Sequence, residues 1–175
     1  MTSLAGPRRL LEQVLVAFCV LQVALLALLV CAAVVLRKFG APLIWYDEVA
    51  SIMLAWLTYY GAALAALNRA HLGVPSIVAA LSRGPRVALL TGGEILVIGF
   101  FALVAWFGLQ VIIILEGDHL ISLPWVPVSF TQSVIPIGAV LFIIAELLTF
   151  PERLAEAWRG EAGVDPERYF EERRP

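Results

Sequence analysis

Residues 37–75 read RKFGAPLIWYDEVASIMLAWLTYYGAALAALNRAHLGVP, and this segment indicates the class of fold. It opens with two cations, passes a cluster of aromatic and acidic residues at 45–48, and then carries no charge from residue 49 to residue 67. About 20 helical residues span the roughly 30 Å hydrocarbon core of a bilayer. We therefore predict one membrane-spanning helix with polar residues at both of its water boundaries.

Small residues follow one side of this predicted helix. They recur at alternating spacings of four and three residues, which places them on one face: Ser51, Ala55, Thr58, Ala62 and Ala65. In a membrane, small side chains let a second helix approach closely, so that packing replaces the missing hydrophobic driving force. Two interpretations remain open here, because this face could pack within the chain or dock against a separate membrane protein.

The composition of the whole chain is that of an integral membrane protein. Hydrophobic residues make up 61% of the 175 residues and charged residues only 15%, whereas soluble domains are about half apolar and a quarter charged. Four segments are long and apolar enough to span a bilayer, at about 13–36, 49–67, 91–115 and 129–150. The first is too long for the apolar core of a signal peptide. We predict an all-α membrane protein whose residues 1–150 form one four-helix membrane domain.

The positions of lysine and arginine predict the orientation. If both termini lie in the cytoplasm, ten of the twelve Lys and Arg residues are inside, and only Arg37 and Lys38 are outside. The positive-inside rule then favours N-in and C-in. Residues 76–86 predict a short helix lying in the inner interface. Residues 151–175 are dense in charge and are expected to form a cytosolic tail that is at least partly disordered.

Polar residues inside or beside the predicted spans are candidates for special roles. Asp47 and Glu48 fall in the first turn of the second span, where the helix dipole favours carboxylates; a pairing of Glu48 with Arg37 is the alternative. Glu94 is a functional-site candidate by default, since a carboxylate below the headgroups is costly, although its nearness to the inner interface favours a structural role. Pro136 is expected to kink the fourth span.

Motifs for nucleotide, zinc or redox chemistry are missing from the sequence. His71 and His119 are predicted on opposite sides of the membrane, so they cannot ligate one haem. No nucleophile and base come together as a lipid-modifying enzyme would need, and nothing indicates nucleic-acid binding. We predict a protein that is neither an enzyme nor a cofactor carrier. An autonomous small oligomeric carrier or channel, using Glu94 and Glu146, is the alternative.

A set of residues in and around the second span resembles the signature region of a known family: Arg37, Trp45, Asp47, Glu48, Trp56, Gly61 and His71. This family is the small membrane subunit of TRAP transporters, the DctQ-like family. The dipeptide LP at 123–124 and the run SVIPIG at 133–138 resemble the entry to that family's fourth helix. The resemblance covers about residues 10–150 and agrees in length, helix count and topology.

The resemblance implies a subunit of a bacterial inner-membrane transporter. A large multi-spanning subunit would carry the substrate and sodium sites, and a periplasmic binding protein would deliver an organic acid. This chain would be a scaffold embedded in membrane lipids, with no cofactor, metal or substrate bound to it, and uptake would be driven by sodium. Its candidate interface or structural residues are Arg37, Trp45, Asp47, Glu48, Ser51, Ala55, Trp56, Thr58, Gly61, Ala62, His71, Glu94 and Pro136.

Overall fold

A computed structural model of the chain describes residues 5–68 and 81–159. Four helices in these residues are long and apolar enough to cross a membrane, as the sequence predicted. They are formed by α1 (Ala5–Lys38), α2 (Tyr46–Leu67), α4 (Arg83–Ile114) and, after the short α5 (Val128–Gln132), α6 (Val134–Arg159). The fold class is therefore confirmed as an all-α architecture with four candidate spans.

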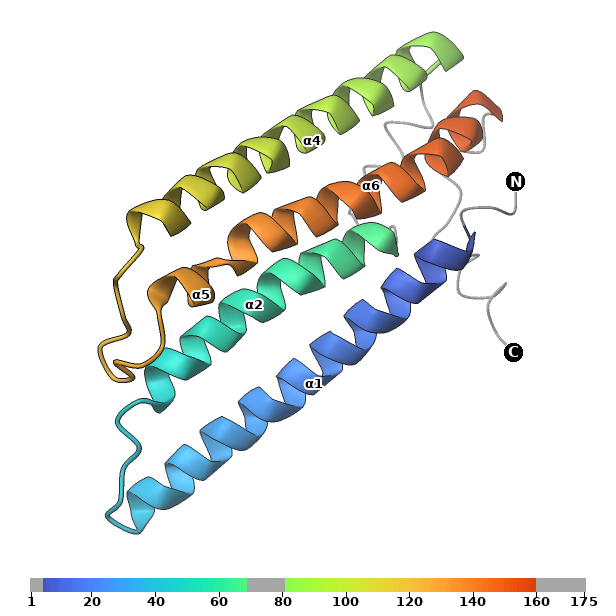
Figure 1. Ribbon diagram of the computed structural model, residues 1–175. Helices are drawn as coiled ribbons and strands as arrows, with labels where there is room; N and C mark the ends of the chain where they lie inside the picture. The colour runs from blue at the N-terminus through green and yellow to red at the C-terminus, as the bar shows by residue number, and fades with distance from the viewer. Residues whose placement is uncertain (1–4, 69–80, 160–175) are drawn as a thin grey trace, which may run out of the picture.

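The long helices lie side by side in a single row, in the order α1, α2, α6, α4 (Figure 1). Extensive contacts join only neighbours in this row: α1 with α2, α2 with α6, and α6 with α4. Only α6 is buried over close to half of its most apolar stretch, and the other three helices are mostly exposed along theirs. The chain thus forms an open layer with two uncovered faces.

The small core lies where α1, α2 and α6 meet. Its fully buried members are mostly alanines and leucines, together with one aromatic side chain: Leu15, Ala63, Ala66, Leu67, Phe142 and Ala145. Phe142 also stacks on Phe101 of α4, with ring centroids 3.8 Å apart. The small side chains let the axes approach closely, which is the usual way that helices associate in lipid.

Proline explains the interruption between α5 and α6. A proline ring clashes with the carbonyl four residues earlier, which for Pro136 is the carbonyl of Gln132, the last residue of α5. The break therefore falls at Ser133, and Pro136 lies in the first turn of α6, where its missing N–H costs nothing. The sequence predicted a kink within the helix, two turns after its start, and the structure places the break before it.

Two predicted boundaries differ from the observed ones. Helix α4 begins at Arg83, so Arg83 and Arg86 belong to the third span and not to the end of a separate interfacial helix. Helix α6 continues through Pro151 to Arg159, beyond the predicted boundary at residue 150. His71, residues 76–80 of the predicted interfacial helix and residues 160–175 lie outside the described residues.

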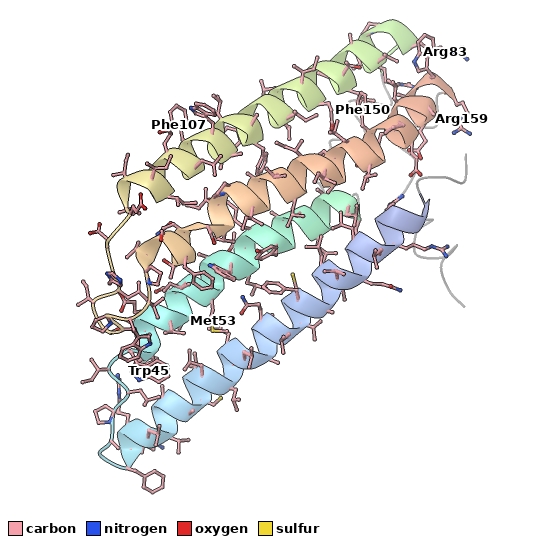
Figure 2. The ribbon with its side chains drawn as sticks, in the orientation of Figure 1. Trp45, Met53, Arg83, Phe107, Phe150 and Arg159 are labelled. Atoms are coloured by element: carbon pink, nitrogen blue, oxygen red, sulfur yellow. The ribbon has the colours of Figure 1, made fainter. Side chains whose placement is uncertain are left out.

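The two ends of the row differ in chemistry. Trp45 lies at the end that holds the α1–α2 and α4–α5 connections, whereas Arg83 and Arg159 lie at the opposite end (Figure 2). Following the orientation predicted from the arginines, we call the Trp45 end the outer end and the Arg159 end the inner end.

Candidate subunit interface

Glu48 joins the start of α2 to the connection between α4 and α5 (residues 115–127), which we call the outer loop. Its carboxylate accepts hydrogen bonds from the backbone N–H of Ser122 at 2.9 Å, from that of Ile121 at 3.3 Å and from the Ser122 hydroxyl. The loop itself is ordered by backbone bonds, including Leu120 N–H to Val126 C=O at 3.0 Å. Of the two roles left open for Glu48, neither simple capping nor a pair with Arg37 describes these contacts.

Arg37 instead contacts the residue that begins α2. Its guanidinium donates a hydrogen bond of 3.4 Å to the Tyr46 hydroxyl and lies 5.8 Å from the centroid of the Tyr46 ring. Asp47 is exposed in the first turn of α2, and Trp45 is half-buried at its N-cap position. The contact of Arg37 with Tyr46 joins the outer ends of α1 and α2.

Trp56 links α2 to α5. Its indole N–H donates a 3.0 Å hydrogen bond to the carbonyl of Thr131, and its ring lies 5.4 Å from that of Phe130 and 6.3 Å from that of Tyr60. A membrane-buried indole N–H needs such a partner. Trp56 therefore joins α2 to α5 within the chain.

The small-residue face of α2 is only partly covered. Ser51, Ala55 and Thr58 are exposed, while Ala62 is half-buried. The hydroxyls of Ser51 and Thr58 bond to carbonyls of their own helix, at 2.9 Å and 2.8 Å, so neither side chain needs an outside polar partner. A Cβ added at Gly61 would meet nothing within 4 Å. The outer half of this face has no helix packed on it in the described chain.

A charged cluster lies toward the inner end, between α4 and α6. One guanidinium nitrogen of Arg153 contacts the carboxylate of Glu94 at 2.6 Å and also that of Glu146. Both glutamates are buried, with side chains 8% and 4% exposed. One internal cation therefore engages both carboxylates, Glu94 through a single oxygen.

A second arginine joins three helices at the inner end. Arg8 of α1 forms a 3.0 Å salt bridge with Glu152 of α6 and donates a 3.1 Å hydrogen bond to the carbonyl of Leu67. That carbonyl is at the C-terminus of α2, where a positive charge is favourable. Helix α6 thus binds α1 through Glu152 and α4 through Arg153.

Sequence reasoning missed Arg8, Arg153 and two glycines. Gly108 approaches Pro136, so that an added Cβ would lie 3.0 Å from the proline Cδ. Gly138 approaches Tyr59, where an added Cβ would lie 2.7 Å from the tyrosine Cβ. For Arg153, the available signal was its spacing of seven residues from Glu146, which puts both on one helical face.

The chain is similar to a known protein family over most of its length. Residues 26–156 match the family model described as tripartite ATP-independent periplasmic transporters, DctQ component. The chain belongs to this family. DctQ is a component of transporters and not a family of enzymes, and the match includes α2, α4, α5, most of α6 and the outer part of α1. No curated protein matches the chain at a significant level.

Proposed function

We propose that this DctQ component is a scaffold for the large membrane subunit of its transporter. That subunit would move an organic acid delivered by a periplasmic binding protein, and a sodium gradient would drive uptake. The observation that carries the proposal is the open row of helices, in which α1, α2 and α4 bury little of their length. A layer of this kind offers a long, continuous face to a partner in the membrane.

The internal contacts support a rigid body. The Arg8 and Arg153 clusters join all four long helices near the inner end, and Glu48 and Trp56 bind the outer loop and α5 to α2. A moving transport domain needs a fixed part against which it can be displaced. The contacts at both ends of the row support such a role for this chain.

One groove in the described chain offers little of the polar chemistry that an organic acid requires. The groove between the outer halves of α4 and α6 is lined almost entirely by apolar side chains, among them Leu109, Ile112, Pro136 and Ile137. A carboxylate is recognised by arginine, lysine or several N–H donors. This groove therefore supports placing the substrate site in the large subunit.

Mild-detergent purification of the tagged chain from its native membranes, followed by mass spectrometry, tests the proposal. We expect a large multi-spanning subunit to be recovered in stoichiometric amount. Recovery of the chain alone or as a homo-oligomer would contradict the scaffold function. Transport by the purified chain alone in liposomes would instead establish the autonomous carrier that Glu94 and Glu146 first suggested.

A further inference from the structure

Contacts between neighbouring helices define their relative heights along the row. The ring of Phe18 on α1 lies 4.6 Å from that of Tyr60 on α2, and Gly138 on α6 lies against the adjacent Tyr59. These contacts bring α1, α2 and α6 to a common level, which we call the Tyr60 level. Heights along each helix then follow from a rise of 1.5 Å per residue.

The same scale extends to α4. Phe142 of α6 stacks on Phe101 of α4 with centroids 3.8 Å apart. Phe142 comes four residues after Gly138, so this pair lies about 6 Å further toward the inner end than the Tyr60 level. Each helix of the row is now placed relative to the others.

The inner membrane boundary lies at a different height on each helix, and the height changes in one direction from α1 to α4. At 1.5 Å per residue, the first arginine toward the inner end lies about 13 Å inward of the Tyr60 level on α1, about 22 Å on α6 and about 28 Å on α4. These residues are Arg9, Arg153 and Arg86. Arg153 is held in the buried cluster and Arg86 is buried, but exposed charged residues lie at or beyond these levels, at Arg9, Glu152 and Arg83. Charged residues of this kind mark the inner headgroup layer, so that layer meets α1 earliest and α4 latest.

The outer boundary is displaced in the same direction. The first charged residue toward the outer end lies about 28 Å outward of the Tyr60 level on α1, about 18 Å on α2 and about 16 Å just after α4. These residues are Arg37, Glu48 and Glu116. In Figure 1 the outer ends of α4, α2 and α1 correspondingly lie on a line that crosses the helix axes obliquely.

Both displacements give a similar angle. Packed helix axes are 8–10 Å apart, so α1 and α4, separated by two helices, are about 27 Å apart. Shifts of about 12 Å and 15 Å over that distance correspond to an inclination of about 25°, within the 0–40° range of membrane helices. We infer that the row is tilted by this angle within its own plane, with α1 displaced toward the inner side of the bilayer and α4 toward the outer side.

The length of α1 agrees with this tilt. Its uncharged run at 13–36 is about 36 Å long and exceeds the roughly 30 Å hydrocarbon core; a tilt of 25° reduces its height to about 33 Å. In an upright row, the exposed Val34 and Val35 would stand beyond the level at which Glu48 meets water. The tilt raises the outer water boundary on α1 by about 4 Å relative to α2, which brings both side chains closer to lipid.

Two spin-label sites at the same height on the edge helices test the inference. Val23 of α1 and Leu109 of α4 are both exposed and lie about 7 Å outward of the Tyr60 level. In the full chain with Cys19→Ala and Cys31→Ala, we would label Val23→Cys or Leu109→Cys and measure depth in liposomes by collision with oxygen and a water-soluble nickel complex. We expect the Leu109 label to lie about 10 Å nearer the outer surface. Equal depths would overturn the inference.

Polarised infrared dichroism of the unmodified chain gives an independent measurement. The long helices run nearly side by side (Figure 1), so the amide I order parameter in oriented bilayers reports their common tilt. A tilt of about 25° is expected, and a value below about 10° would contradict the inference even if the labelled variants failed to fold. The scaffold proposal is tested by co-purification of a large subunit, and that result does not depend on the tilt. The tilt and the scaffold function can therefore fail separately.

Discussion

Arg153 brings together two buried carboxylates from different helices. Glu94 comes from α4 and Glu146 from α6, and both contact the same guanidinium nitrogen. A buried carboxylate costs several kcal/mol unless a cation or hydrogen bonds compensate it. The cluster therefore stabilises the α4–α6 pair only while its arginine is present.

We expect Arg153→Ala to destabilise the purified chain by about 3–5 kcal/mol, because removal of one partner leaves a buried charge poorly compensated. The measurement is the midpoint of thermal unfolding in mild detergent. Arg9→Ala is the matched control, since Arg9 is an exposed arginine near the same end. Equal midpoints for the two variants would show that the cluster contributes no stability.

Glu48→Ala removes the acceptor for three donors of the outer loop. Without it, we expect faster hydrogen exchange at residues 120–122 and weaker assembly or transport, because three donors of the loop lose their charged acceptor. The ratio of uptake between two competing substrates should stay unchanged, because Glu48 is not proposed to touch substrate. A changed ratio would count against a purely scaffolding role. Asp47→Ala is the control, because Asp47 is exposed in the same helical turn.

At the level of elements, α6 holds the row together because α2 and α4 both approach it closely at glycine residues. Gly138 faces α2 and Gly108 of α4 faces the start of α6. We expect Gly138→Ala to push α2 and α6 apart and to cost about 1–3 kcal/mol through overpacking. The unfolding midpoint measures this effect. Gly99→Ala, where an added Cβ meets nothing within 4 Å, should be neutral or slightly stabilising.

The sequence predicted the elements better than their contacts. Uninterrupted apolar runs are enough to find four spans, because the bilayer sets their length. They do not show which helices are neighbours, so the uses of Glu48 and Trp56 within the chain could not be foreseen. The end of α6 was placed too early, since Pro151 and the charges after it resemble a tail; the contacts of Glu152 and Arg153 with α1 and α4 lie in this extension.

For the whole molecule, the single row means that every helix has surface to offer on two faces. Phe107 of α4 points away from α6 (Figure 2) and is well exposed, as a lipid-facing aromatic residue would be. The outer half of the α2 face differs, because Ser51, Ala55 and Thr58 are small. Small side chains suit helix packing, whereas bulky ones suit lipid contact. This contrast favours the α2 face as the docking surface for the proposed large subunit.

Ala55→Leu and Ala102→Leu make the same change in volume on α2 and α4, at two positions that are both exposed. If the large subunit packs on the α2 face, Ala55→Leu should lower its affinity by about 1–3 kcal/mol, or roughly 5- to 150-fold. Ala102→Leu should leave the affinity unchanged, and neither variant should shift the unfolding midpoint of the isolated chain. The measurement is the amount of large subunit recovered with each tagged variant. Equal recovery would place the interface on another face of the row, because replacing a lipid-facing alanine with leucine does not weaken subunit packing.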